Sequence, residues 1–169
     1  MDNQNNFFIS NIVMDSIRIL ILISKFEVKK TFKLTIDKIM LYDYYMKFPN
    51  TMIDTSSLNV NVKYDFYEYY SFYHWKPIIG EYNKILKYLI SKGFIEHNVD
   101  KKVSYYIITD RGLEFLGNLN SIYKQSLEIL SDFIKSNISK KSDSEVENEI
   151  LTKISIINRF KGEENGKTV

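Results

Sequence analysis

The fold class is decided by the stretch from Ile78 to Gly112, which is I-I-G-E-Y-N-K-I-L-K-Y-L-I-S-K-G-F-I-E-H-N-V-D-K-K-V-S-Y-Y-I-I-T-D-R-G. Its first half predicts a helix that starts after Pro77, because proline suits the first turn of a helix. Apolar side chains recur on one face of that helix, at Ile78, Tyr82, Ile85, Leu86 and Leu89. Gly93 is placed to end the helix in a left-handed conformation.

The second half of this stretch predicts a β-hairpin and a further helix. Two runs rich in β-forming residues, Phe94–Val99 and Lys102–Thr109, flank a turn signal at Asp100-Lys101. Asp110 can cap the helix that follows. The order of these elements is that of a winged helix-turn-helix. We therefore expect a mainly α fold with a small β-hairpin, in which a winged helix-turn-helix core carries N- and C-terminal helical extensions.

Two helices are predicted before this stretch. The first covers Asn11–Phe26 and is apolar nearly all round, which is typical of a helix buried on most sides in a core or a subunit contact. The second covers Thr35–Phe48, where Thr35 is a suitable cap and the apolar residues recur at helical spacing. Pro49-Asn50 is expected to end it.

The C-terminal part predicts two amphipathic helices, Ser121–Asn137 and Ser144–Phe160, separated by the polar residues Lys140–Asp143. These assignments divide the chain into four parts. We expect a flexible N-terminus (1–10), a winged-helix core (11–118) with an aromatic-rich insertion near 51–76, a C-terminal helical extension (119–161) and a disordered tail (162–169).

The composition excludes several functional classes. The chain has 169 residues, 44% hydrophobic and 26% charged, which suits one domain with helical extensions. A formal charge of +2 excludes a strongly basic nucleic-acid coat protein. The chain has no cysteine, and two histidines, His74 and His97, leave little for a zinc site or a catalytic triad. Because it also lacks a glycine-rich phosphate loop, we expect no enzyme, no cofactor and no metal.

The chain shows no sign of membrane insertion or export. Its longest apolar run, Ile17–Ile23, is interrupted by Arg18 and is far shorter than the ~20 residues that a membrane span requires. Residues Met1–Asn6 lack the positive start of a secretory signal. The chain also has no alanine and is rich in Ile, Lys, Asn and Tyr, which indicates an AT-rich bacterial genome. We therefore expect a cytoplasmic bacterial protein.

An aromatic-rich segment runs from Tyr64 to Trp75. Its rings could stack on unpaired bases, but it has few cations, and such segments are more typical of cores and protein interfaces. A few aromatic side chains usually dominate the energy of an interface. The candidate partner-binding residues are Tyr67, Tyr70, Phe72 and Trp75.

A second candidate surface is basic. The helix after Pro77 offers Lys84 and Lys87, and the hairpin turn offers Lys101 and Lys102, as candidate nucleic-acid-binding residues. Acidic residues in the same stretch cancel most of this charge, and no arginine is placed to read guanine. The sequence therefore favours protein docking over specific DNA reading for the winged element.

Five motifs, taken in order, resemble the middle components of bacterial ABC-three-component systems. They are D-S-I-R-I-L-I-L-I-S (Asp15–Ser24), L-T-I-D-K-I-M-L-Y-D-Y-Y (Leu34–Tyr45), L-I-S-K-G-F-I-E (Leu89–Glu96), Y-Y-I-I-T-D-R-G (Tyr105–Gly112) and L-N-S-I-Y-K-Q-S-L (Leu119–Leu127). The second motif holds an Asp-aromatic pair, Asp43-Tyr44, that the family also shows. The aromatic-rich segment departs from the family pattern.

The resemblance implies a small non-enzymatic subunit. Such middle components are similar to the small subunit of the Lamassu anti-phage complexes. They act with an SMC- or Rad50-like ATPase and a separate effector, often a nuclease or hydrolase. By that analogy, the chain bridges the ATPase and the effector and helps to hold the effector inactive until foreign DNA is sensed.

The alternative is a sequence-specific transcriptional regulator. In that hypothesis the winged helix binds promoter DNA, and the chain dimerises through its C-terminal helices. The salt dependence of DNA binding, and its loss when Lys84 and Lys87 are neutralised, distinguishes this hypothesis from the first.

Overall fold

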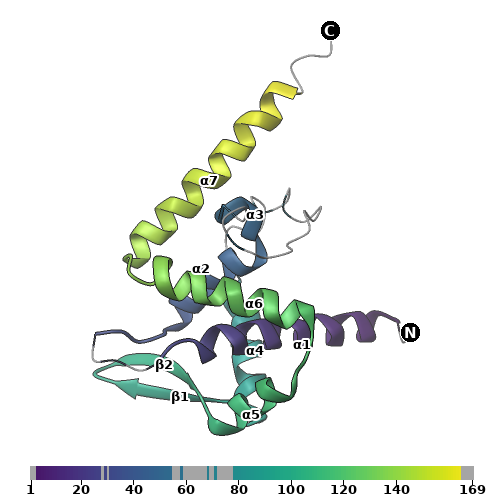
Figure 1. The fold of residues 1–169 in the computed structure, drawn as a ribbon, viewed down its shortest axis with the longest axis vertical. Coiled ribbons are helices and arrows are strands. Elements are labelled where there is room, and N and C mark those ends of the chain that lie inside the picture. The colour runs from purple at the N-terminus through teal and green to yellow at the C-terminus, as the bar shows by residue number, and fades with distance from the viewer. Residues whose placement is uncertain are drawn as a thin grey trace.

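The computed structural model describes residues 3–27, 29, 31–54, 58, 68, 71 and 78–164, and the side chains of those that lie within 12–155. This part of the chain is mostly helical with a two-stranded antiparallel sheet (Figure 1). Its elements are α1 (Asn3–Ser24), α2 (Ile36–Lys47), α3 (Pro49–Met52), α4 (Ile79–Ser91), β1 (Ile95–Asp100), β2 (Val103–Ile108), α5 (Asp110–Asn118), α6 (Ile122–Phe133), the π-helical η3 (Ile134–Ile138) and α7 (Asp143–Glu164).

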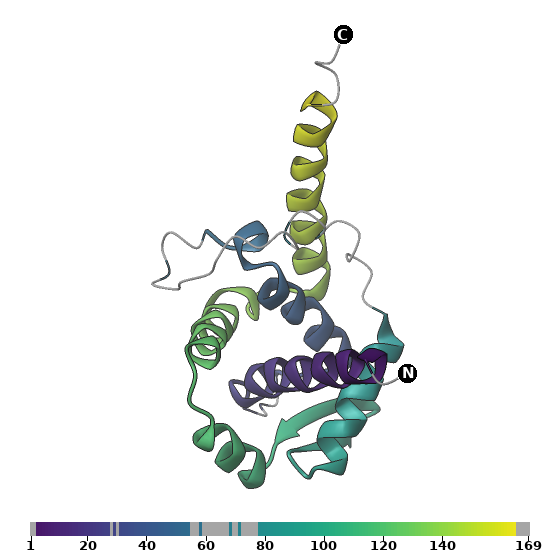
Figure 2. The same ribbon diagram turned by 90° about the vertical axis from the view of Figure 1, so that its right-hand side faces the viewer.

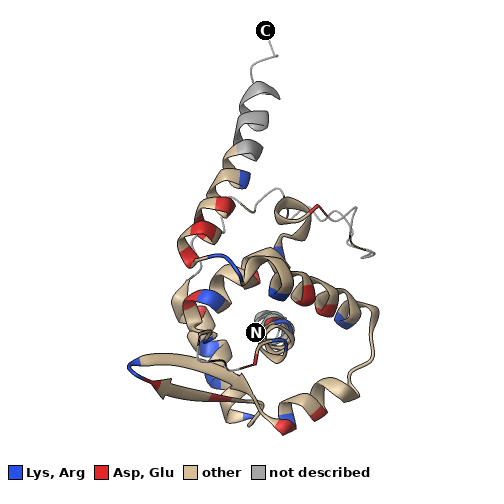
Figure 3. Cartoon of the chain, turned by 60° about the vertical axis from the view of Figure 1, so that its left-hand side comes forward, with Lys and Arg blue, Asp and Glu red and all other residues tan. Residues whose placement is uncertain are grey.

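Helix α1 forms the centre of the body. Five consecutive side chains, Ile19 to Ile23, are fully buried, so α1 is covered on every side over this stretch. Figure 3 looks approximately along α1 and shows the other elements arranged around it. The prediction of a helix buried on most sides is therefore confirmed, and the covering elements belong to the same chain. Helix α1 also starts at Asn3, within the segment predicted to be flexible, because extending an existing helix costs little.

The predicted second helix is confirmed as α2. The Thr35 hydroxyl accepts a hydrogen bond from the backbone N–H of Lys38 and so caps the helix. Helix α2 ends at Lys47, just before Pro49-Asn50, as predicted. Pro49 then opens the short helix α3, because proline has no N–H and its fixed φ suits a first helical turn.

Helix α4 and the hairpin follow the predicted order, with small shifts. Gly93 ends α4 at φ +70°, as expected. Asp100 pairs with Val103 at the end of the ladder, so the turn lies at Lys101-Lys102 and not at Asp100-Lys101. Helix α5 is capped by Thr109, whose hydroxyl accepts from the Gly112 N–H at 3.1 Å, and not by Asp110.

The connector between α1 and α2 lies beside the hairpin. The Tyr106 N–H on β2 donates to the Leu34 carbonyl at 3.0 Å. Just before it, Lys29 and Phe32 pair across an isolated bridge. The extended connector therefore attaches the start of α2 to the second strand.

The C-terminal helices differ in how much of them packs on the body. Helix α6, capped by Ser121, packs along α1 and continues as the π-helical turn η3. Helix α7 buries Val146, Ile150 and Ile154 near α2 and α3, then extends away from the body (Figures 1 and 2). Its backbone is helical to Glu164, so the first residues of the expected tail continue the helix, whereas residues 165–169 lie outside the described part.

Candidate functional site

The four candidate basic residues lie on two neighbouring elements. Lys84 and Lys87 are exposed on α4, and Lys101 and Lys102 are exposed at the hairpin turn. Helix α4 packs against β1, so the helix and the hairpin belong to one unit. Figure 3 shows the basic tip of the hairpin standing away from the body. The structure thus places two pairs of lysines in solvent, one on a helix and one at a turn.

The candidate partner-binding aromatics lie outside the described residues. These are Tyr67, Tyr70, Phe72 and Trp75. Their proposed role therefore stays a prediction.

A buried ionic cluster lies beneath α4 and joins three helices. The fully buried carboxylate of Asp43 on α2 accepts from Arg18 Nε on α1 at 2.6 Å. The hydroxyl of Tyr82 on α4 donates to the second Asp43 oxygen at 2.7 Å. Lys47 Nζ lies 3.1 Å from that same oxygen. Arg18 Nη2 donates both to Asp15 at 2.6 Å and to the second Asp43 oxygen at 3.3 Å. Both oxygens of the buried carboxylate are therefore satisfied.

The electrostatics keep this cluster charged. Burial by itself raises the pKa of Asp43, but the charges of Arg18 and Lys47 and the hydrogen bonds from Arg18 and Tyr82 lower it to about 2. Burial together with the Asp43 carboxylate raises the pKa of the Tyr82 hydroxyl far above its ordinary value. Neither group exchanges a proton near neutral pH, so the cluster fixes the orientation of α1, α2 and α4 and is not suited to acid–base chemistry.

The partners in this cluster could not be identified from the sequence. Arg18 interrupts an apolar run, and a buried charge requires an opposite charge, so its presence was the one available signal. Its partner Asp43 is 25 residues away, and Tyr82 is 39 residues further. The Asp-aromatic pair noted in the family motif contains Asp43, but local spacing does not show what it contacts.

Glu68 is a second buried acid that sequence reasoning did not assign. Its carboxylate accepts from the backbone N–H groups of Asn50 and Thr51 at 3.0 and 3.1 Å, and from the Thr51 hydroxyl at 2.6 Å. Nearby, the Tyr44 hydroxyl donates to the Ser71 carbonyl at 2.7 Å. Two described positions of the insertion are thus attached to α2 and α3.

Exposed apolar side chains gather along one flank of α6. Ile122, Ile129 and the half-buried Phe133 follow i, i+7 and i+11 spacing, and Ile122 is 76% exposed. The N-terminal end of α4 also carries two exposed apolar side chains, Ile78 and Ile79. Exposed apolar groups at helical spacing are typical of contact surfaces.

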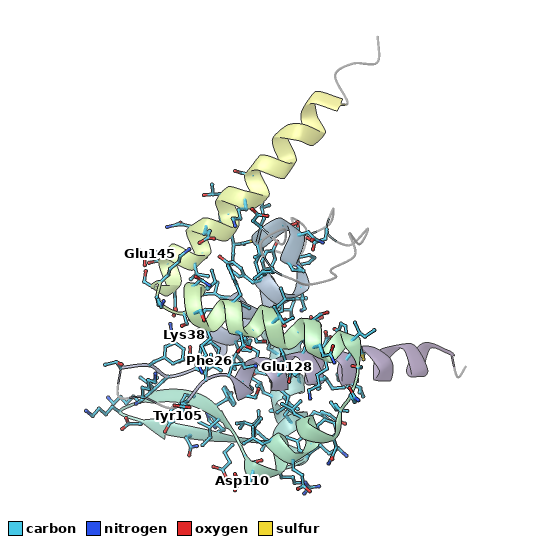
Figure 4. The ribbon with its side chains drawn as sticks, in the orientation of Figure 1. Phe26, Lys38, Tyr105, Asp110, Glu128 and Glu145 are labelled. Atoms are coloured by element: carbon cyan, nitrogen blue, oxygen red, sulfur yellow. The ribbon has the colours of Figure 1, made fainter. Side chains whose placement is uncertain are left out.

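An ion pair and a hydrogen bond attach α7 to the body. Lys38 on α2 pairs with Asp143 at the start of α7, close to Glu145 (Figure 4). Lys153 donates to the Met52 carbonyl at the end of α3. These contacts, with the buried apolar residues, hold the first half of α7.

The described residues contain no group of three or more His, Cys, Asp or Glu that could hold a metal ion. His97 stacks on the ring of Tyr106 at 5.0 Å, whereas His74 lies outside the described residues. Among the helices of the described part, none is long and apolar enough to cross a membrane.

The fold and these surfaces define a class of small, mostly helical proteins that present exposed basic and apolar faces on a fixed helical core. A match to a protein-family model identifies the family within this class. The ABC-three component (ABC-3C) system Middle Component 2 model matches residues 10–159, so the chain belongs to this family. No curated protein and no solved structure matches it. As a middle component of a multi-subunit system, the chain acts with partner proteins.

Proposed function

We propose that this chain is a non-catalytic accessory subunit that links an SMC- or Rad50-like ATPase to an effector, a nuclease or a hydrolase. The complex would defend a bacterium against phages or plasmids, as the similar Lamassu assemblies do. The subunit would act in the cytoplasm and hold the effector inactive until foreign DNA is sensed. The observation that carries this proposal is the family match over residues 10–159.

The exposed apolar flank of α6 supports a linking role. A standard interface buries ~800 Å² on each partner, more than isolated surface residues provide. The flank at Ile122, Ile129 and Phe133 could form part of one interface, and the half of α7 that projects from the body could form part of a second. Two separate surfaces are what a subunit between two partners requires.

The arrangement around the hairpin supports a winged helix. The connector at Leu34 contributes a hydrogen bond to β2, as the first strand of a winged helix does, and α4 precedes the hairpin in the position of the third helix. The insertion lies between α2 and α4, so the winged-helix elements surround it in sequence. We propose that these elements form a winged helix.

The linking role is tested by leaving this chain out. The ATPase, carrying an affinity tag, is co-expressed with the effector in the presence and the absence of this chain. Linking predicts that the effector co-purifies with the ATPase only when this chain is present. Recovery of the same amount of effector without the chain would contradict the proposal.

A matched pair of variants tests the interface. Ile122→Glu places a charge on the α6 flank, and Val99→Glu places the same charge on the hairpin, at a side chain that is 63% exposed. Both sites are in solvent, so both variants should fold. We expect only Ile122→Glu to lose a partner, and equal recovery of all partners by both variants would exclude this flank as an interface.

A further inference from the structure

We propose that the outer face of α4 and the hairpin turn contact the phosphate backbone of duplex DNA without reading its sequence. Two independent observations carry this inference: the side-chain order on α4 and the conformation of the turn.

The outward line of α4 is made of lysines and small residues. Gly80, Lys84, Lys87 and Ser91 follow i, i+4, i+7 and i+11 spacing and so lie on one line along the helix. The residues that α4 buries are on the opposite side, at Tyr82, Ile85, Leu86 and Leu89. This outward line carries two positive charges and no carboxylate, and the one carboxylate on α4, the exposed Glu81, lies beside the line near its N-terminal end.

The two lysines are available to a ligand. Among the described residues, neither Lys84 nor Lys87 forms an ion pair. A Cβ added at Gly80 would meet no atom within 4 Å, so the surface beside the lysines is open. Small residues at both ends of the line allow a backbone to approach the helix closely, and the adjacent Asn83 can hydrogen-bond to phosphate oxygens.

The buried side of α4, opposite this line, is fixed to the body. Its Tyr82 donates to the buried Asp43, and Figure 2 shows α4 on the outside of the body, across α1 from α6. A rigid helix presents its lysines at fixed spacing, which a regular polyanion can match. The position opposite α6 leaves the proposed protein interface free while DNA is bound.

The hairpin turn is the second observation. Lys101 and Lys102 have φ of +49° and +69°, the left-handed region that favours glycine. Positive φ at both central residues defines a type I′ turn, for which Asn-Gly is strongly preferred. A pair of lysines is therefore unfavourable for the turn itself, and such strain points to a role for the side chains.

The charge around the turn supports this role. Asp100, next to the turn, is paired with Lys33 from the connector. Its carboxylate is thus neutralised from within the chain, and Lys101 and Lys102 keep their charges at the tip. A point charge on a flexible stem, as in lysine, suits phosphate better than it suits base reading. An acidic protein surface is the competing ligand, but it has no regular spacing that would favour the line on α4.

The first test measures binding of the full chain to labelled duplex DNA by fluorescence anisotropy over a salt series. The variant Lys84→Gln/Lys87→Gln is compared with Lys135→Gln/Lys140→Gln, which removes the same charge from exposed residues outside α4. Each lost phosphate contact lowers the slope of log K against log salt by about 0.9. We expect the α4 variant to lower the slope by about two and the control to leave it nearly unchanged, with unrelated DNA sequences bound equally.

The second test removes the two lysine charges of the hairpin turn without destabilising the fold. Lys101→Asn/Lys102→Gly installs the preferred type I′ residues, so it should preserve or raise the melting temperature while it weakens DNA binding. Unchanged DNA binding would remove the hairpin turn from the proposal. Equal loss in the α4 variant and its control, no binding of the wild-type chain at low salt, or binding of an acidic protein surface in place of DNA would overturn it.

Discussion

The buried cluster around Asp43 allows a quantitative prediction. Asp43→Ala removes the carboxylate that pairs with Arg18 and accepts from Tyr82. The guanidinium of Arg18 then stays in a site where its side chain is only 9% exposed, with Asp15 alone as its acidic partner. Removing one member of a buried ion pair costs about 3–5 kcal/mol because the other charge is left without compensation.

The pKa of Asp43 gives a second value for the same interaction. A pKa held at about 2, against 3.8 for a free aspartate, corresponds to about 2 kcal/mol of stabilisation of the charged form at neutral pH. Asp43→Asn keeps the shape of the side chain and loses the charge. We therefore expect Asp43→Asn to cost about 2 kcal/mol and Asp43→Ala to cost more.

The assay is urea unfolding followed by circular dichroism, with the free energy extrapolated to water. Asp132→Ala is the control, because its ion pair with Lys25 is at the surface and should contribute less than about 1 kcal/mol. The double variant Arg18→Met/Asp43→Leu, which replaces both charges with apolar side chains, should recover most of the loss. A cost below about 1 kcal/mol for Asp43→Ala would refute the assigned role of the cluster.

Four further predictions follow from the same structure. The pKa of Asp43 is lowered in the folded state, so its carboxylate stabilises the fold above about pH 4. This stabilisation should be lost as the pH falls towards 2. Unfolding of the wild type and of Asp43→Asn over a pH series will show the loss in the wild type alone. Gly112→Ala should destabilise the fold by at least 1–3 kcal/mol, since a Cβ there would lie 2.3 Å from the Phe94 carbonyl oxygen, whereas Gly80→Ala should be tolerated in thermal melts. Glu68→Ala should cost about 1–3 kcal/mol in urea unfolding, because it leaves the N–H groups at the start of α3 without their acceptor. Trp75→Ala should abolish co-purification of a partner and leave the circular dichroism spectrum intact; loss of the folded signal would make Trp75 a core residue.

Elements with a strong periodicity could be predicted from the sequence. The apolar face of α4, the glycine that ends it and the β-rich runs of the hairpin are local signals, and each was found near its predicted place. The exposure of Lys84 and Lys87 also follows from that periodicity. The sequence alone therefore identified all four lysines of the proposed DNA-binding surface.

Element boundaries were predicted less well where two adjacent residues could each form the cap or the turn. Thr109 and Asp110 are both good caps, and the choice depends on which hydroxyl or carboxylate reaches the Gly112 N–H. The turn was placed one residue early because Lys101-Lys102 carries no turn signal, and Asp100 belongs to the ladder. Boundaries of this kind are set by the packed structure.

Contacts between distant residues could not be predicted. The Asp43 carboxylate receives donors from α1 and α4, which are far from it in sequence, and Glu68 reaches back to α3 from within an aromatic-rich segment. No local pattern encodes these pairings, since they depend on how α1, α2 and α4 pack. The buried charge of Arg18 indicates that a partner exists but not which residue it is.

The central claim, that this chain is a subunit that joins an ATPase and an effector, is tested most directly by the mass of the intact complex. The chain is co-expressed with the proposed ATPase and the proposed effector, purified through a tag on this chain, and its complex is weighed by native mass spectrometry. The account predicts one stable assembly that contains all three proteins. Purification of the chain alone as a dimer that selects a short DNA sequence would contradict it and support the transcriptional regulator.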